Sequence, residues 1–173
     1  MKSIIKSLYT IILILSQFGI IGCSSVPKTV SHAKTVKGEM MLIGNITREE
    51  LFQEMPVFQK NYDVYNPAGS AIETLHRMST PTDILIVLGT WCGDSKHHVP
   101  SFLKTLDAAK NPNLTYRLLA VDRTKKDSLG VTTQYNIKRV PTMIVLRNGA
   151  EIGRMVEFPQ KTVEEDLLDI VKP

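Results

Sequence analysis

Cysteine is scarce in this chain, with only Cys23 and Cys92 among 173 residues. The spacing of four zinc ligands is absent, so we expect no metal, and nothing in the composition indicates a cofactor. The length excludes a large multidomain enzyme, while 43% of apolar residues is ordinary for a chain with one packed core. One domain with a short additional segment is therefore the expected organisation.

The chain also lacks any dense stripe of lysine and arginine. Its formal net charge is +4, but Lys2 and Lys6 lie in the first 22 residues, which contain no acidic residue. Without that segment, 19 basic residues stand against 17 acidic ones. No aromatic residues alternate with the basic ones, so we expect no nucleic-acid partner.

No apolar run near the N-terminus reaches the roughly 20 residues of a comfortable membrane span. The runs at residues 11–15 and 18–21 follow two lysines and are typical of an export signal. They end at residues 20–24 (Ile-Ile-Gly-Cys-Ser), which resemble the bacterial lipobox. This resemblance implies cleavage before Cys23 and lipid attachment there. An ordinary signal peptide and an uncleaved anchor are the alternatives.

This interpretation divides the chain into a lipoprotein signal peptide (1–22), a polar flexible tether (23–37) and a folded domain (38–173). It predicts an exported, membrane-anchored lipoprotein that faces the periplasm of a bacterial cell envelope. Ser24 resembles the signal that directs such proteins to an outer membrane. With Cys23 carrying lipid, Cys92 has no partner for an intramolecular disulfide.

Three predicted helices begin with an N-cap hydroxyl and a glutamate three residues later. They span residues 47–60, 70–78 and 162–171, and each has an apolar stripe on one side. The capping pairs are Thr47 with Glu50, Ser70 with Glu73, and Thr162 with Glu165. Another helix is expected from about residue 95 to 109.

The strands are predicted from apolar runs. Residues 84–88 and 115–121 are typical of buried strands, and Asn-Gly at 148–149 predicts a hairpin between 142–146 and 152–156. The order strand, helix, strand, short helix, hairpin, helix predicts an α/β fold. Its mixed central sheet has helices on both faces and an added N-terminal helical segment.

The most distinctive segment, residues 91–95 (Trp-Cys-Gly-Asp-Ser), joins the first buried strand to the next helix. Cys92 is thus expected at a helix N-terminus, where unpaired N–H groups and the positive dipole end favour a thiolate. A second segment, Val140-Pro141-Thr142, directly precedes the hairpin. These two segments are the candidates for chemistry.

Together they resemble the thioredoxin superfamily, whose signature is Trp-Cys-x-x-Cys at a strand-to-helix junction and x-Pro-Thr before a hairpin. The resemblance spans about residues 80–172 and implies a thioredoxin-like fold. It also implies a cis peptide at Val140-Pro141, near the sulfur of Cys92, where a substrate backbone would pair. Within the superfamily, Trp-Cys-Gly-Asp-Ser resembles a one-cysteine bacterial branch.

Three departures from the family pattern limit what this resemblance implies. Ser95 stands in place of the resolving cysteine, so the intramolecular release of a mixed disulfide is impossible. Ile86 replaces a buried acid that is implied to manage the proton of that missing thiol, and Asp94 replaces the usual proline. Enzymatic turnover is therefore an open question at this stage.

The expected site combines one nucleophile with a small binding surface. Cys92 attacks or accepts a disulfide, and Ser95 helps to stabilise its thiolate. The expected substrate-binding residues are Trp91, Gly93, Asp94, Val140 and Pro141.

Two neighbouring groups have less definite roles. His97 and His98 are expected as solvated helix residues; the alternatives are an influence on the thiol or a soft-metal site with Cys92 and Asp94. Lys138 and Arg139 are the basic residues expected close enough to receive an acidic partner.

The leading hypothesis is monothiol thiol–disulfide exchange, reductase-like or isomerase-like, on exported proteins or small disulfides. The expected partners are a disulfide- or thiol-containing exported protein or a small thiol, and the membrane through the lipid; we expect a monomer. The alternative is a non-catalytic, membrane-tethered module that binds partners in the Pro141 groove. A membrane-anchored metal carrier is a third hypothesis.

Overall fold

The computed structural model describes residues 33–36, 38–67 and 69–172. These residues belong to one compact unit, Ser31–Pro173. The expected signal peptide, the expected lipid attachment site Cys23 and most of the expected tether lie outside the described residues. Among the described residues, no helix is both long and apolar enough to cross a membrane.

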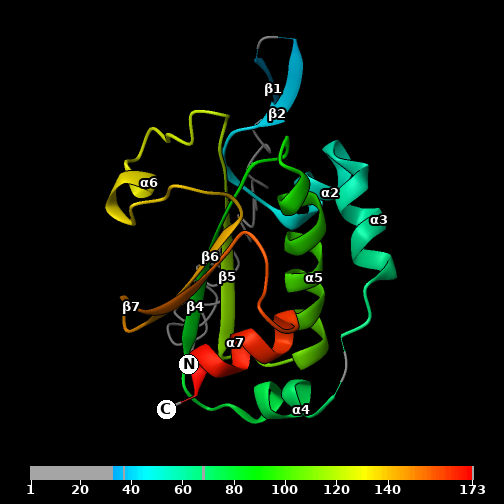
Figure 1. Cartoon of the computed structure of the whole chain (residues 1–173), viewed down its shortest axis with the longest axis vertical. Helices are drawn as coiled ribbons and strands as arrows, with labels where there is room; N and C mark the ends of the chain where they lie inside the picture. Colours follow the sequence, from blue (N-terminus) through cyan, green and yellow to red (C-terminus); the bar gives the residue numbers. More distant parts are fainter. Residues whose placement is uncertain (1–32, 37, 68, 173) are drawn as a thin grey trace, which may run out of the picture. The chain divides into compact units, whose positions relative to one another are not determined.

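A five-stranded mixed sheet forms the centre of the unit (Figure 1). Its strand order is β3-β5-β4-β6-β7, with β4 and β5 parallel and the other neighbours antiparallel. The strands are β3 (Gly44–Ile46), β4 (Thr82–Leu88), β5 (Leu114–Ala120), β6 (Thr142–Arg147) and β7 (Ala150–Val156). The predicted mixed sheet is confirmed.

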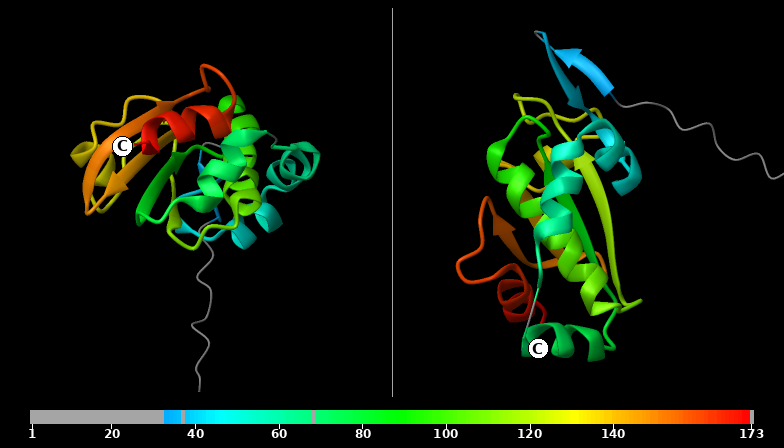
Figure 2. Two further views of the ribbon diagram at one scale, coloured as in Figure 1. Left: turned by 90° about the horizontal axis from the view of Figure 1, so that it is seen from below. Right: turned by 90° about the vertical axis from the view of Figure 1, so that its right-hand side faces the viewer.

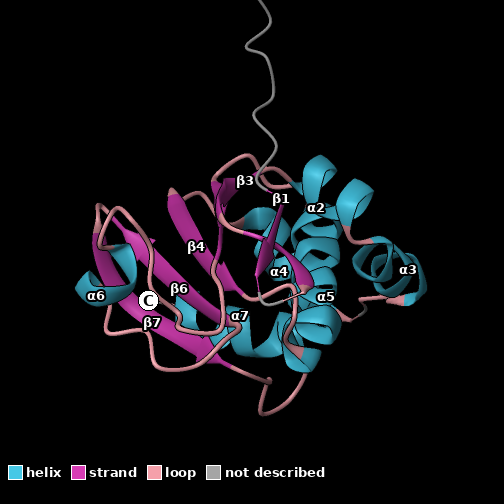
Figure 3. Ribbon diagram, turned by 90° about the horizontal axis from the view of Figure 1, so that it is seen from above, coloured by secondary structure: helices cyan, strands magenta, loops and turns pink. Residues whose placement is uncertain are grey.

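Helices lie on both sides of this sheet. They are α2 (Arg48–Glu54), α3 (Pro56–Val64), α4 (Ser70–Arg77), α5 (Gly93–Ala109), α6 (Val131–Gln134) and α7 (Val163–Val171). Figure 3 shows α2, α3 and α5 to one side of the strands and the short α6 to the other. The predicted α/β class with helices on both faces is confirmed.

Because successive strand residues point to opposite faces, β4 supplies two separate buried clusters. Ile84, Ile86 and Leu88 join a large cluster with residues of α2, α3, α4, α5 and α7. Leu85 and Val87 join a smaller cluster, against which Trp91 and Cys92 pack. We call the first side the helix-covered face and the second the thiol face.

A second, two-stranded sheet precedes the main one. Strands β1 (Ala33–Val36) and β2 (Glu39–Leu42) pair antiparallel outside the main sheet. In the right-hand view of Figure 2 they project beyond the end of the sheet at which α5 begins. The sequence patterns did not predict this hairpin, and β1 falls within the segment expected to be a tether.

The helix expected over residues 47–60 is wrong in one respect, because the chain forms two helices there. The N-cap at Thr47 is confirmed, since its side chain accepts the N–H of Glu50 at 3.0 Å. The first helix ends at Glu54, and Pro56 starts the second. Proline lacks an N–H and disfavours a helical conformation in the preceding residue, so it begins a helix rather than continuing one.

Three further local predictions have different outcomes. Ser70 is not an N-cap: it is the first helical residue of α4, whose N-cap is Gly69 in a positive-φ conformation of 87°. The capping box of Thr162 and Glu165 at the start of α7 is confirmed. The two-residue β6–β7 turn is also confirmed, with φ of 52° and 78° at residues 148 and 149, as Asn-Gly favours.

Candidate active site

Cys92 lies where the chain leaves β4 and enters α5. Its backbone N–H donates to the carbonyl of Gly89 at 2.9 Å, and its own carbonyl accepts the N–H of Lys96 at 3.1 Å. Cys92 is the N-cap of α5 and has an extended backbone, and its side chain makes no capping hydrogen bond to the helix. The predicted position at a helix N-terminus is therefore confirmed, and the thiol is free and half-buried.

The sulfur of Cys92 contacts the segment that precedes the β6–β7 hairpin. Its Sγ lies 3.1 Å from the carbonyl oxygen of Val140, 48 residues away, and the Val140-Pro141 peptide is cis. Both implications of the resemblance are confirmed. The contact exists because β4 and β6 are neighbours, with Val87 opposite Thr142, so both segments emerge at one end of the sheet.

Hydrogen bonds hold the Val140-Pro141 turn from two sides. The Thr142 hydroxyl donates to the carbonyl of Arg139 at 2.8 Å, and the N–H of Glu157 donates to the carbonyl of Pro141 at 2.7 Å. Val140 and Pro141 are themselves buried. The acceptor facing the thiol is thus part of a rigid, paired backbone.

Trp91, an expected substrate-binding residue, packs with Cys92 against the smaller buried cluster of the thiol face. Its indole N–H donates to the carbonyl of Val121 at 3.0 Å. A Cβ on Gly89 would lie 2.6 Å from the indole Cε2, so only glycine leaves room for the ring. The guanidinium carbon of Arg123 lies 4.8 Å from the ring centroid, within cation–π range.

Ser95 is fully buried on the first turn of α5. Its Oγ accepts the N–H of Gly89 at 3.2 Å, which leaves the hydroxyl proton for a second acceptor. Gly93 and Asp94 are exposed beside it, with no atom within 4 Å of a Cβ built on Gly93. The structure thus places residues 91–95 at the start of α5, with the Val140-Pro141 peptide facing Cys92. The catalytic and binding roles of all these residues remain predictions.

The two histidines lie one turn further along α5, with ring centroids 6.5 Å apart. Burial lowers the pKa of His98 below its usual value; Asp94 raises it and His97 lowers it further. This shift favours the neutral form of His98. Within the described part of the chain, no group of three or more histidine, cysteine or acidic side chains is placed to hold a metal ion.

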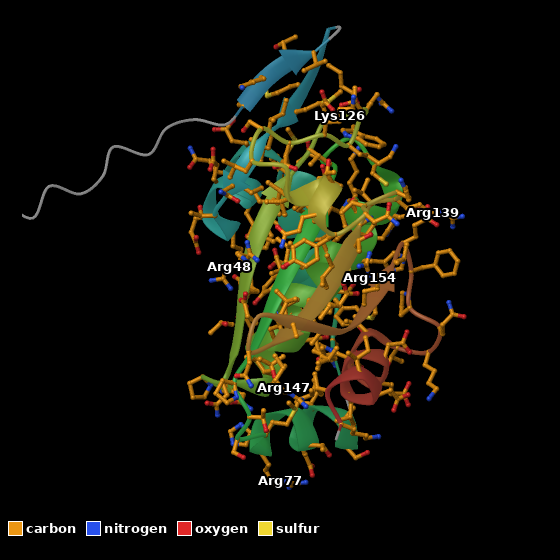
Figure 4. All side chains as sticks on the ribbon, turned by 90° about the vertical axis from the view of Figure 1, so that its left-hand side faces the viewer. Arg48, Arg77, Lys126, Arg139, Arg147 and Arg154 are labelled. Carbon is orange, nitrogen blue, oxygen red and sulfur yellow. The ribbon has the colours of Figure 1, made fainter. Side chains whose placement is uncertain are left out.

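The basic residues near the site are partly neutralised. Arg139 donates to the carboxylate of Glu157 at 2.8 Å, so its charge is already paired. Figure 4 shows Arg139 and Lys126 toward the end of the molecule that carries the β1–β2 hairpin. An acidic partner for Arg139 would have to compete with Glu157.

The sequence analysis missed the supports of Trp91, namely Gly89, the carbonyl of Val121, and Arg123. Gly89 lies just before the Trp-Cys segment, and the carbonyl of Val121 is a backbone group without a sequence signal. Nothing in the sequence distinguishes Arg123 from a solvated surface residue. Its contact with the indole depends on how the segment after β5 returns to the site.

Fold and site together define an α/β protein of thioredoxin type with one thiol at the start of a helix. Residues 47–169 match the thioredoxin family model, so the chain belongs to the thioredoxin family. The β1–β2 hairpin precedes the matched residues.

Similarity to individual proteins is partial. A protein disulfide-isomerase of Ricinus communis is 34% identical over 71 residues, which are 41% of this chain and only 14% of that protein. A thioredoxin of Mycoplasma genitalium is 33% identical over 79 residues, 46% of this chain and 72% of the other. A Pseudomonas aeruginosa protein of unknown function shares the fold, with a TM-score of 0.56 and 16% identity over 69% of this chain and 84% of that one.

Proposed function

We propose that this protein carries out monothiol thiol–disulfide exchange through Cys92, on exported proteins or small disulfides. Membership of the thioredoxin family supports an oxidoreductase of this general type. The observation that carries the proposal is the 3.1 Å approach of Cys92 Sγ to the carbonyl of Val140. It puts the only thiol of the described residues beside a backbone against which an extended, disulfide-bearing segment would lie.

The first step forms one bond and breaks one. The Cys92 thiolate attacks one sulfur of the substrate disulfide, a mixed disulfide forms, and the other substrate sulfur leaves as a thiolate that takes a proton from water. The positive end of α5 favours the attacking thiolate, because Cys92 is the N-cap and the first N–H groups of the helix are unpaired. The Ser95 hydroxyl has one proton left to donate in a hydrogen bond that stabilises the thiolate. The place for the substrate is lined by Trp91, Gly93, Asp94, Val140 and Pro141.

The second step needs a thiol that this site does not contain. In isomerisation, another thiol of the same substrate attacks the substrate sulfur of the mixed disulfide, which forms a new substrate disulfide and releases the Cys92 thiolate. In reduction, a small external thiol attacks the Cys92 sulfur of the mixed disulfide, which releases the reduced substrate and leaves the small thiol bonded to Cys92. A second equivalent of that thiol then attacks this adduct, which forms the small-molecule disulfide and releases the Cys92 thiolate. Because Ser95 replaces a resolving cysteine, isomerisation is the reaction that this site suits best.

The N-terminal segment sets where this reaction takes place. We propose an exported lipoprotein that Cys23 anchors in a bacterial cell envelope, facing the periplasm, where the domain works as a monomer. The lipobox-like residues 20–24 support this location, and the oxidising envelope supplies disulfide-bonded substrates.

The test is the formation of a mixed disulfide in the full chain with Cys23→Ser, where Cys92 is the only thiol. We expect acid-quenched intact mass spectra to show an adduct with oxidised glutathione and with a scrambled disulfide-bonded model protein. Cys92→Ala should abolish both adducts. Ser95→Cys should shorten the lifetime of the adduct, because the new thiol can resolve it. A free Cys92 that forms neither adduct would contradict the proposal.

A non-catalytic binding module is the second candidate, and the absent resolving thiol favours it. Ile86, which occupies the position of the family's buried acid, is fully buried in the helix-covered face and offers no proton transfer. Capture of envelope proteins by immobilised protein separates the two candidates. Capture that survives Cys92→Ala would support the binding module, whereas capture lost in that variant would support thiol chemistry.

A further inference from the structure

Trp91, the single tryptophan of the chain, is held on more than one side. Gly89 leaves space for the ring, and the indole N–H donates to the carbonyl of Val121 at 3.0 Å. Arg123 then places its guanidinium 4.8 Å from the ring centroid. Since an arginine side chain has many rotamers, that contact needs something to hold the guanidinium in place.

The holding group comes from the β1–β2 hairpin. The Glu39 carboxylate accepts from Arg123 Nη2 at 2.8 Å and from Arg123 Nε at 3.2 Å, across 84 residues of sequence. A carboxylate that accepts from two nitrogens of one guanidinium fixes the plane of that group as well as its position. The guanidinium held in this way is the one that lies over the Trp91 ring.

A second bond joins the same hairpin to the loop between β4 and α5. The N–H of Leu42, at the end of β2, donates to the Thr90 hydroxyl at 3.2 Å, and both residues are buried. Thr90 directly precedes Trp91. Residues 33–42 therefore contact the active-site loop directly at Thr90 and reach Trp91 indirectly through Arg123, although they precede the part of the chain that matches the family model.

We propose that the β1–β2 hairpin is a positioning element of the candidate active site, in which Glu39 holds Arg123 against the indole of Trp91. This inference rests on the proposed function, because the held indole is one wall of the place where a disulfide-bearing peptide segment binds. Glu39 and Arg123 act through Trp91 and not on the reacting sulfur. The hairpin therefore fixes the position of the Trp91 indole, which forms one side of the proposed substrate-binding place.

The expected effects are moderate, because the side chains of Arg123 and Glu39 are 59% and 43% exposed. Exposed ion pairs contribute roughly 0.2–1 kcal/mol, which corresponds to an equilibrium shift of up to about fivefold. Salt screens such pairs, so about 1 M sodium chloride should move the unmodified protein toward the behaviour of a variant without the pair.

The experiment uses the full chain with Cys23→Ser and three readouts. Acrylamide quenching of the single tryptophan reports how well the indole is held. The rate of mixed-disulfide formation with a short disulfide-bonded peptide reports the binding wall, and alkylation by iodoacetamide reports the thiol alone. In Glu39→Gln and Arg123→Met we expect quenching to rise and peptide exchange to slow, each by up to about fivefold, with unchanged alkylation.

Two further variants separate positioning from simple attachment of the hairpin. The matched control is Glu73→Gln, which removes an exposed pair with Arg77, a residue that Figure 4 shows at the end of the molecule opposite the hairpin. It should change none of the readouts. The exchanged pair Glu39→Arg with Arg123→Glu keeps the ion pair and removes the cation from the indole, so quenching should stay high.

Unchanged quenching in Glu39→Gln and Arg123→Met overturns this inference, even where Cys92 exchanges disulfides normally. Full recovery of quenching and exchange in the exchanged pair also overturns it, because the hairpin would then act through attachment alone. Absence of any peptide adduct in the unmodified protein contradicts the proposed function instead. The quenching results still decide whether Glu39 holds the indole.

Discussion

The helix-covered face and the thiol face of the sheet differ in how much packed structure covers them. The first buries the inward side chains of β3–β7 beneath α2, α3, α4, α5 and α7. The second has the short α6, the segment leading to Pro141 and the site residues themselves. Far from the thiol, it opens into a groove of about 420 Å³ that Leu146, Tyr135 and Arg117 help to line.

This difference teaches that stability and chemistry are assigned to opposite sides of one sheet. Burial of apolar surface is the main source of folding free energy, and most of it lies on the helix-covered face. The proposed exchange between Cys92 and another protein needs a thin, accessible cover over the thiol, which the other face provides. Changes of the same kind on the two faces should therefore have different consequences.

The largest expected difference comes from two leucines that are truncated in the same way. Leu103 on α5 is fully buried in the helix-covered face, and Leu103→Ala should lower the free energy of unfolding by about 3–5 kcal/mol. Leu146 borders the groove, where solvent reaches the vacated space, so Leu146→Ala should cost only about 2–3 kcal/mol. Urea denaturation measures both. Equal losses would show that the faces are equally well packed.

Two glycines allow the same substitution to be compared on the two faces, one beside Trp91 and one beside Ile170 of α7. A Cβ at Gly89 would lie 2.6 Å from the Trp91 ring, and one at Gly153 would lie 2.7 Å from Ile170 Cγ2. Both Gly→Ala changes should cost about 1–3 kcal/mol by overpacking. Only Gly89→Ala should shift the tryptophan emission and slow disulfide exchange. A comparable emission shift in Gly153→Ala would break the separation of the faces.

Two helix caps give a smaller contrast. The Asp127 carboxylate accepts the N–H groups of Leu129, Val131 and Thr132, whereas Thr162 caps α7. Asp127→Ala and Thr162→Ala should each cost about 1 kcal/mol. We expect hydrogen exchange to accelerate around α6 in the first variant and around α7 in the second. Acceleration across both faces in either variant would contradict independent behaviour.

Asp127 also makes this contrast pH-dependent. Burial opposes its ionisation, but hydrogen bonds from Thr132, Val131 and Leu129 outweigh that effect and hold its pKa below the usual value. Its contribution to stability is therefore complete above the unfolded-state pKa of about 4 and is lost as the pH falls through the lowered value. Asp127→Asn should remove that part of the acid dependence, as unfolding curves at several pH values would show.

The smallest expected effect belongs to His98, beside the start of α5. Burial lowers its pKa, with Asp94 opposing and His97 reinforcing the shift, so the unfolded chain binds more protons just below pH 6.5. Stability should therefore fall slightly as the pH drops from about 7 to 5. His98→Gln should flatten that slope relative to His97→Gln in thermal unfolding. An identical slope in both variants would show that His98 does not contribute.

Local patterns predicted most of the regular structure. The apolar runs of β4–β6, the Asn-Gly hairpin, the N-cap at Thr47 and the capping box at Thr162 each depend on a few neighbouring residues. The break before Pro56 was also available from proline chemistry, although the apolar stripe suggested one helix. The β1–β2 hairpin was not, because its position depends on Thr90 and Arg123, far along the chain.

The sequence by itself determined that one cysteine follows an apolar strand, begins a helix and has serine in place of a resolving thiol. Those features depend on residue type and short-range order. Only the tertiary structure decided that Cys92 meets Val140 and that Glu39 reaches the guanidinium above Trp91. Such contacts join residues 48 and 84 positions apart, and the pairing of strands and packing of the hairpin, not local propensity, bring them together.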